Sequence, residues 1–235
     1  MESGGLDRRS LFTQTPTHPP GLASLFTVIR GRTALFLACA AWLGLRAWAA
    51  LRPTAFPYLA RSILELPRPL ITRSGLLEIL EPASGERILE VGPGTGYYTL
   101  QVADRLGPGG LLEILDVRQG FLDHTMRRAA EQGIVNMTPT EADATSLPYE
   151  EGTFDAAFLI TVLGEIPDPE AALAELRRVL KPAGRLVVGE IFIDPDFPRL
   201  AWLVSCARAA GLTLERRTGT PAAYFARFRA ESNVE

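Results

Sequence analysis

The chain has 235 residues, of which 47% are hydrophobic and 22% are charged. This length suggests one domain, or one domain with an extension, and the apolar fraction excludes a wholly disordered chain. Glycine and proline occur at near-average frequency, which excludes collagen-like and low-complexity classes. The two cysteines, Cys39 and Cys206, lie far apart in the sequence and provide neither a disulfide framework nor a metal-ligand spacing. We therefore expect no metal site and a reducing, cytoplasmic environment.

Charge divides the chain into two parts. Residues 1–73 contain nine arginines and three acidic residues, a net charge of +6, whereas residues 74–235 contain 15 basic and 24 acidic residues, a net charge of -9. Together these give the overall net charge of -3. Because phosphate backbones are bound by clustered lysine and arginine, the acidic body argues against a nucleic-acid partner.

The N-terminal part is predicted to be a flexible tail over residues 1–20 and a hydrophobic, basic helical extension over residues 21–73. Within the extension, residues 21–52 are mostly apolar and include Trp42 and Trp48; Arg30 and Arg32 interrupt the stretch before an almost wholly apolar run over residues 33–45. Three interpretations remain open. The segment could associate with a membrane, pack as a buried helix or lid on the main domain, or pair with a second copy of itself.

The main domain is predicted to span residues 74–235. Hydrophobic periodicity and turn residues predict helices over 74–80, 97–106, 121–132, 169–180 and 201–210. They predict strands over 88–91, 111–116, 134–139, 154–161, 185–193, 212–217 and 222–229. Alternating strands and helices indicate an α/β fold with a mostly parallel sheet, and the last two strands indicate a C-terminal antiparallel pair.

A glycine-rich turn follows the first predicted strand. Gly92, Gly94 and Gly96 are spaced as G-x-G-x-G, whereas a dinucleotide-binding turn has the spacing G-x-G-x-x-G. Glu90 stands two residues before the first glycine, where a carboxylate would repel a pyrophosphate. The acid suits instead a ligand that carries an ammonium or a sulfonium group.

Two further acids follow later strands. Asp116 lies 20 residues after Gly96, at the end of the second strand, where an acid can bind both hydroxyls of a ribose. Its alternative role is the N-cap of the next helix, for which Asp123 is a second candidate. Asp143 could accept a hydrogen bond from an adenine amino group, or it could serve only as a turn residue.

These motifs together carry a resemblance to a known family. They comprise ILEVGPGTGYYTL, then Asp116, then ADATSLPYEEGTFDAAFLITVL and AALAELRRVLKPAGRLVVGE. The chain resembles the class I S-adenosylmethionine-dependent methyltransferases, and within them the group that includes the ubiquinone/menaquinone C-methyltransferases. The resemblance covers residues 70–230. It implies a Rossmann-like, seven-stranded sheet with its last strand inserted antiparallel, helices on both faces, and S-adenosylmethionine as the cofactor.

The resemblance also assigns roles to residues. It places the three glycines beside the methionine part of the cofactor, with Glu90 supporting the loop or the cofactor's amino group. It gives the ribose to Asp116, the adenine to Asp143 and Ala144, and the edge of the methyl-transfer pocket to Thr161. The Asn/Asp-Pro-Pro-Tyr signature of nucleic-acid and amide methylases is absent after the fourth strand, which argues further against a nucleic-acid substrate.

The implied activity is methyl transfer by in-line displacement to a small, hydrophobic acceptor. If a base is needed, the candidates are Glu165, in the loop after the fourth strand, and His124, whose alternative is a helix-surface residue. Two other functions remain as alternatives. One is a catalytically silent cofactor-binding protein tethered to a membrane, and the other is a nicotinamide-dependent oxidoreductase, against which the missing third glycine counts.

Overall fold

The computed structural model describes Ala40 and residues 69–231 of the chain. Ala40 is an exposed helical residue. The predictions of a tail over residues 1–20 and of a membrane-associating segment over residues 21–52 otherwise lie outside the described residues, as does most of the 21–73 extension. Among the described residues, no helix is both long enough and apolar enough to cross a bilayer.

A seven-stranded sheet forms the centre of the described domain. The strands are β1 (Arg87–Val91), β2 (Leu111–Asp116), β3 (Met137–Glu141), β4 (Phe154–Ile160), β5 (Leu180–Ile191), β6 (Leu212–Thr220) and β7 (Ala223–Ala230). Their spatial order is β3-β2-β1-β4-β5-β7-β6. The strands from β3 to β5 are parallel, whereas β7 runs antiparallel to both β5 and β6. The predicted sheet with an inserted antiparallel strand is therefore confirmed.

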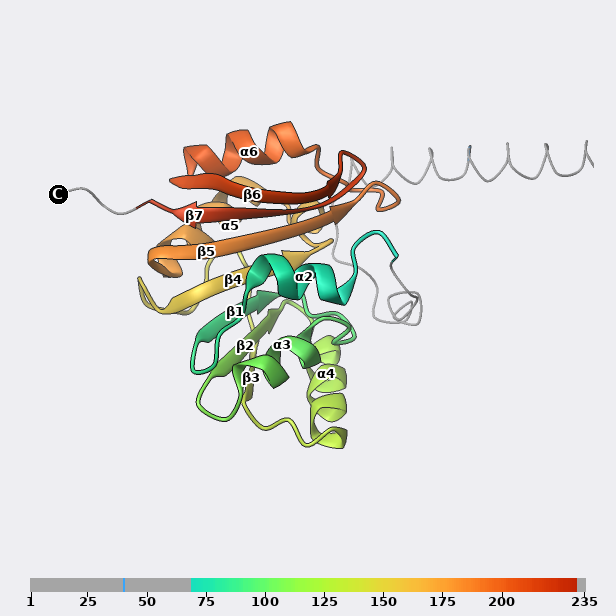
Figure 1. The fold of residues 1–235 in the computed structure, drawn as a ribbon, viewed down its shortest axis with the longest axis vertical. Helices are drawn as coiled ribbons and strands as arrows, with labels where there is room; N and C mark the ends of the chain where they lie inside the picture. The colour runs from blue at the N-terminus through green and yellow to red at the C-terminus, as the bar shows by residue number, and fades with distance from the viewer. Residues whose placement is uncertain (1–39, 41–68, 232–235) are drawn as a thin grey trace, which may run out of the picture. The chain divides into compact units, whose positions relative to one another are not determined.

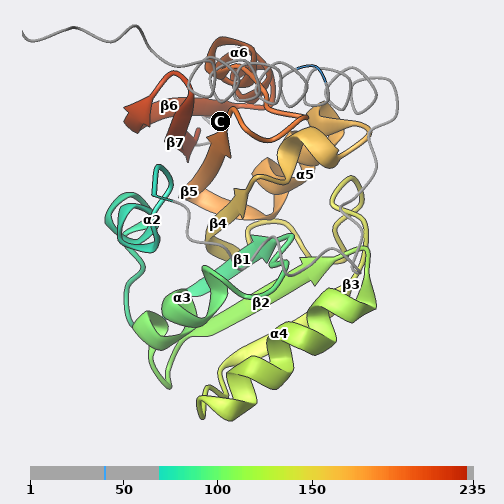
Figure 2. The same cartoon turned by 90° about the vertical axis from the view of Figure 1, so that its right-hand side faces the viewer.

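Helices cover both faces of this sheet (Figures 1 and 2). They are α2 (Arg73–Leu80), α3 (Thr99–Leu106), α4 (Gln119–Glu131), the short 3₁₀ helix η2 (Leu163–Glu165), α5 (Pro169–Val179) and α6 (Leu200–Ala209). One buried cluster joins α5 and α6 to one face, and a second joins α2, α3 and α4 to the other. The central strands are buried on both sides, which explains why β4 is apolar from Ala156 to Ile160.

Two arginines fix the C-terminal end of α2 to the strands. Arg227 of β7 is 8% exposed, and it donates hydrogen bonds to the Ile79 carbonyl at 3.0 Å and to Glu81 Oε2 at 2.7 Å. Arg185 of β5 donates to the Leu80 carbonyl and binds both carboxylate oxygens of Glu86. The last carbonyls of a helix have no partners within it, so these bonds satisfy groups that burial would otherwise penalise.

Most predicted elements are found within two residues of their expected bounds, and Asp168 caps α5 as its sequence position indicates. β3 differs because it begins at Met137 rather than Ile134. The Ile134 amide instead donates to the Ala129 carbonyl and closes α4, and Asn136 donates to two carbonyls near the end of α3. β5 begins at Leu180, ahead of the predicted loop, because Leu180 pairs with Phe154 across an irregularity. The turn between β6 and β7 is also shorter than predicted.

Two adjacent glycines between α3 and β2 allow a matched test of this packing. A Cβ on Gly110 would lie 2.9 Å from the backbone oxygens of both Glu86 and Leu106, whereas a Cβ on Gly109 would meet nothing within 4 Å. We expect Gly110→Ala to lower the free energy of unfolding by about 1–3 kcal/mol, and Gly109→Ala to change it by less than about 0.5 kcal/mol. Denaturant unfolding of both variants measures this. Equal effects would contradict the packing described for this loop.

Candidate functional site

The sequence-predicted cofactor residues meet at one edge of the sheet, at the carboxyl ends of the parallel strands. Glu90 is the penultimate residue of β1 and Asp116 is the last residue of β2. Asp143 and Ala144 follow β3, and Thr161 follows β4 directly. Crevices outside these strand ends are where open α/β sheets bind their ligands. The topology therefore brings these residues to one edge, although the most distant two, Glu90 and Thr161, are 71 positions apart in the sequence.

The glycine-rich turn between β1 and α3 has a backbone conformation that residues with a side chain rarely adopt. Gly92, Gly94 and Gly96 have φ angles of 69°, 56° and 76°, all in the left-handed region. A Cβ on Gly92 would also lie only 2.4 Å from Val162 Cγ2. The turn thus packs directly on the segment that follows β4, and glycine at position 92 is required for both reasons.

Helix α4 holds this turn from the other side. The Thr125 hydroxyl donates to the Gly94 carbonyl at 3.1 Å, and Arg128 donates to the Thr95 carbonyl. A Cβ on Gly96 would lie 3.0 Å from Thr125 Cγ2. Thr125 is completely buried, so the contact is fixed by packing as well as by hydrogen bonding. The turn is therefore pre-formed by contacts on both sides.

Glu90 is the most unusual acid of this edge. Its side chain is 3% exposed on the face covered by α2, α3 and α4, and its Oε2 atom has no hydrogen-bond partner among the described residues. Burial, and to a lesser degree the neighbouring Asp116 carboxylate, raises the pKa of Glu90 to about 8, and the Thr99 side chain opposes the shift. A buried carboxyl group without a hydrogen-bond partner is costly, and a positively charged ligand beside the glycine turn would stabilise it.

Asp116 is half-buried at the neighbouring strand end. Burial raises its pKa to about 6, and the backbone amide of Arg118, which donates to Asp116 Oδ1 at 2.9 Å, opposes the shift. The residue at the N-cap of α4 is Arg118, which makes no capping hydrogen bond through its side chain. The alternative role of Asp116 as the cap is therefore wrong, as is that of Asp123, which lies inside the helix and accepts from Gln119. The ribose role stays a prediction.

Asp143 has the turn geometry that the sequence left as an alternative. Its Oδ1 accepts hydrogen bonds from both the amide and the hydroxyl of Thr145 at 2.8 Å, and these bonds lower the pKa of Asp143. The residue is exposed, whereas Ala144 beside it is buried. The turn and the proposed adenine contact are compatible, because the second carboxylate oxygen has no part in these bonds. The adenine contact remains a prediction.

The segment after β4 carries backbone strain. Thr161 has a φ angle of 56°, and for a β-branched residue this left-handed conformation costs about 1–3 kcal/mol. Its amide donates to the Gly189 carbonyl of β5 at 2.8 Å, which helps to hold the conformation. Glu165 ends the short helix η2 that follows. A Cβ on Gly164 would lie 2.1 Å from the Asp196 backbone oxygen, so η2 packs tightly on the loop after β5.

A second buried acid was not singled out from the sequence. Glu190, near the end of β5, is 1% exposed, and its Oε1 atom has no hydrogen-bond partner among the described residues. Burial raises its pKa well above the usual range, and the carboxylates of Asp194, Glu165 and Asp196 add to the shift. The available signal was an acid at the end of an apolar strand, as with Glu90. Glu190 faces α5 and α6, the opposite side of the sheet from Glu90.

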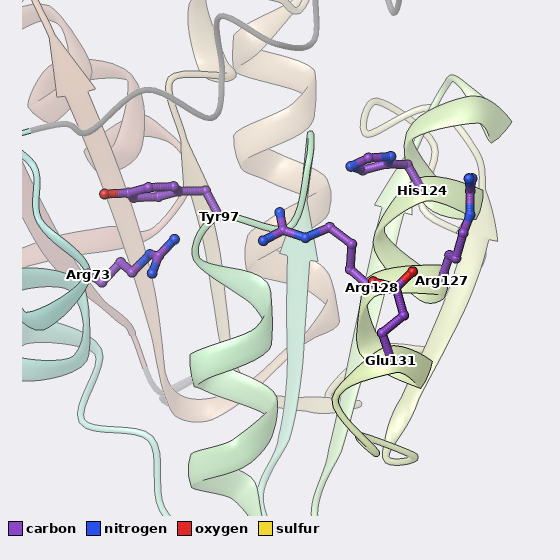
Figure 3. Close-up of a pocket in the computed structure, with 6 residues that line it drawn as sticks. All are labelled: Arg73, Tyr97, His124, Arg127, Arg128 and Glu131. Carbon is purple, nitrogen blue, oxygen red and sulfur yellow. The ribbon is translucent and has the colours of Figure 1, made fainter.

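His124, the other candidate base, lies on α4. It lines a cavity of about 420 Å³ with Arg73, Tyr97, Arg127, Arg128 and Glu131 (Figure 3). Glu165 is not among these lining residues, and the roles of both candidate bases stay predictions. Within residues 69–231, no group of three or more His, Cys, Asp or Glu side chains could hold a metal ion.

Comparison with known proteins identifies the domain. Residues 88–184 match the methyltransferase domain family. The ubiquinone/menaquinone biosynthesis C-methyltransferase UbiE of Saccharophagus degradans is 32% identical over 121 residues, which are 51% of this chain and 48% of the relative. The demethylmenaquinone methyltransferase of Clavibacter sepedonicus is 34% identical over 137 residues, 58% of this chain and 54% of the relative. The chain thus spans about half the length of these curated relatives.

Solved structures share the fold. A SAM-dependent methyltransferase from Aquifex aeolicus has a TM-score of 0.68 and 19% identity, and the match covers 74% of this chain and 99% of that one. The [4+2]-cyclase SpnF has a TM-score of 0.62 and 22% identity over 68% of this chain and 80% of its own. The sheet order, the glycine turn and the methyltransferase match over residues 88–184 together support a class I S-adenosylmethionine-dependent methyltransferase.

Proposed function

We propose that this protein transfers a methyl group from S-adenosylmethionine to a ring carbon of a small, lipophilic quinol. The observation that carries the cofactor assignment is Glu90, a buried carboxyl group with an unsatisfied oxygen beside the glycine turn. The acceptor class is supported by the names of the relatives, which act in ubiquinone and menaquinone biosynthesis. Because the chain matches only about half of those relatives, the acceptor is inferred and tested below.

The residues at the sheet edge fit this cofactor. Glu90 would receive the ammonium of its methionine part, and the open backbone of the glycine turn would lie against that part without steric hindrance. Asp116 would accept from the ribose hydroxyls, and Asp143 with Ala144 would border the adenine. When bound, the cofactor supplies a methyl group activated by a sulfonium. The chain then has to align the acceptor and exclude water.

The acceptor would enter over the carboxyl ends of β4 and β5. Phe192 and Ile193 are 42% and 59% exposed there, beside the buried Glu190, and such apolar side chains suit a lipophilic molecule. Methylation of a quinol ring forms a carbon–carbon bond, breaks a carbon–sulfur bond and releases one proton. We assign that proton to Glu165. We assign Glu190, which burial and its acidic neighbours hold protonated, a hydrogen bond to an oxygen of the acceptor.

The first prediction concerns turnover. We expect the full chain to convert a prenylated 1,4-naphthohydroquinone, with formation of S-adenosylhomocysteine and a mass gain of one methylene on the ring. Glu165→Gln should lower kcat by about a hundredfold or more, since it removes the base. Glu150→Gln, at an exposed loop position, is the charge-matched control. Mass spectrometry of the quinol fraction gives the result.

Two outcomes would overturn parts of this assignment. Tight cofactor binding without methylation of any quinol, with or without a prenyl chain, would favour the cofactor-binding partner protein. An unchanged kcat in Glu165→Gln, with methylation intact, would exclude Glu165 as the base but keep the reaction.

The second prediction concerns the ribose. We expect Asp116→Asn to weaken S-adenosylmethionine binding by about ten- to a hundredfold, because it removes the charge from hydrogen bonds to the two hydroxyls. Asp123→Asn, only seven residues away and exposed on α4, should leave the affinity unchanged. Calorimetric titration of both variants measures the difference. Equal affinities would remove Asp116 from the site.

The third prediction concerns protons. Because the pKa of Glu90 is about 8 before binding, its carboxyl group is mostly protonated at pH 7, and pairing with an ammonium favours its ionised form. Cofactor binding at pH 7 should therefore release up to about one proton. Titrations in two buffers of different ionisation enthalpy detect this release. Glu90→Gln should abolish the buffer dependence, and a wild-type protein without any such dependence would contradict the ammonium assignment.

The same shift predicts how stability depends on pH. The folded-state pKa of Glu90 is higher than that of the unfolded chain, so the fold favours the protonated form. Its contribution is fully present below the unfolded pKa near 4.5 and is lost as the pH rises through about 8. Between pH 5 and pH 9, wild-type stability should fall more than that of Glu90→Gln in denaturant unfolding without cofactor. Parallel pH profiles would show that Glu90 is ionised in the free protein.

A further inference from the structure

A cavity whose lining includes none of the residues that the proposed function assigns to the cofactor or the acceptor is lined mainly by cationic side chains. It has a volume of about 420 Å³ and lies between α2, the start of α3 and α4 (Figure 3). The lining residues are Arg73, Tyr97, His124, Arg127, Arg128 and Glu131. Three guanidinium groups and an imidazole thus surround it, with one carboxylate. Apart from Arg73, these residues belong to the part of the chain, residues 74–235, that carries a net charge of -9.

The three arginines differ from six other arginines of the domain, which form ion pairs. Among the described residues, no carboxylate lies within ion-pair distance of Arg73, Arg127 or Arg128. Other arginines of the domain do pair with carboxylates, namely Arg87, Arg178, Arg185, Arg216, Arg227 and Arg229. Uncompensated guanidinium groups repel one another when they share a cavity, and an anion between them relieves that repulsion.

Two of the arginines that line the cavity are held in place by neighbouring groups. The Arg73 guanidinium lies over the Tyr97 ring at 4.0 Å from its centroid, which fixes its plane. The Nε atom of Arg73 is buried and has no hydrogen-bond partner among the described residues. Arg128 is anchored through Nη1 on the Thr95 carbonyl. Two guanidinium groups are thereby held in place before any ligand arrives.

We propose that this cavity binds the phosphate group of a phosphate ester. Guanidinium groups bind phosphate oxygens through paired hydrogen bonds, and two or three of them around one cavity match a group with three acceptor oxygens better than a planar carboxylate. The volume leaves room for the organic part next to the phosphate. The same chemistry is offered by a soluble phosphate ester and by the headgroup of phosphatidic acid, and the experiment distinguishes these two sources.

The test uses the full chain with two double variants of equal charge. Arg73→Gln/Arg127→Gln removes two cations of the cavity, whereas Arg105→Gln/Arg208→Gln removes two exposed arginines of α3 and α6. Arg128 is left in place because it also supports the glycine turn. Phenyl phosphate is titrated by calorimetry, and co-sedimentation is measured with phosphatidylcholine vesicles that contain or lack phosphatidic acid. Thermal melting and S-adenosylmethionine titration confirm that each variant is folded.

We expect binding of phenyl phosphate, of phosphatidic-acid vesicles, or of both, and a loss of about tenfold or more in the cavity variant but not in the control. Binding of phenyl phosphate alone identifies a soluble ester as the ligand, binding of the vesicles alone identifies the lipid headgroup, and binding of both shows that the cavity accepts the phosphate group from either source. No binding of either probe, or an equal loss in both double variants, would overturn the proposal. If the cavity variant does not fold, Arg127→Glu at the exposed rim provides the same comparison against Arg105→Glu.

Discussion

The burial of Glu90 is the constraint on which the cofactor edge depends. A carboxyl group that is 3% exposed, with one oxygen unsatisfied, is costly unless it is protonated or meets a cation. Glu90 is held in this buried position because β1 is a central strand that pairs with parallel strands on both sides. Burial of Glu90 therefore destabilises the free protein, and a bound cationic ligand would offset that destabilisation. This arrangement also selects against pyrophosphate ligands, since Glu90 offers their charge no cation and its ionised form would repel it.

The glycine turn transmits this constraint to the acceptor side. Gly92 packs against Val162, which follows the strained Thr161 at the end of β4. Because the two loops are closely packed at this point, a shift of one loop toward the other would displace it. The strain at Thr161 is sustained by the hydrogen bond from its amide to β5. The edge that would hold the cofactor and the edge that would receive the acceptor thus form one packed unit.

The sequence predicted the fold nearly completely and the site in part. Hydrophobic periodicity located the helices and strands because packing on a two-sided sheet imposes it. The glycines, Glu90 and Asp116 were located by their spacing relative to strand ends, which is a local property. Glu190 was missed because its significance depends on its burial and on Glu165, which is 25 positions away and approaches it only in the fold. The arginine cavity was missed for the same reason, since Arg73 and Arg127 are 54 positions apart.

Acidic and basic side chains gather in different places in this domain. The carboxyl ends of the central strands collect acids, and burial raises the pKa of Glu90, Asp116 and Glu190 there, which suits a cationic cofactor and the release of a proton. The arginines gather instead between α2 and α4, on the outer side of the glycine turn. Arg128 belongs to both arrangements, because it lines the cavity and also holds the Thr95 carbonyl. An anion in the cavity would therefore compete for the cation that steadies the turn, and the two sites would be coupled through that one side chain.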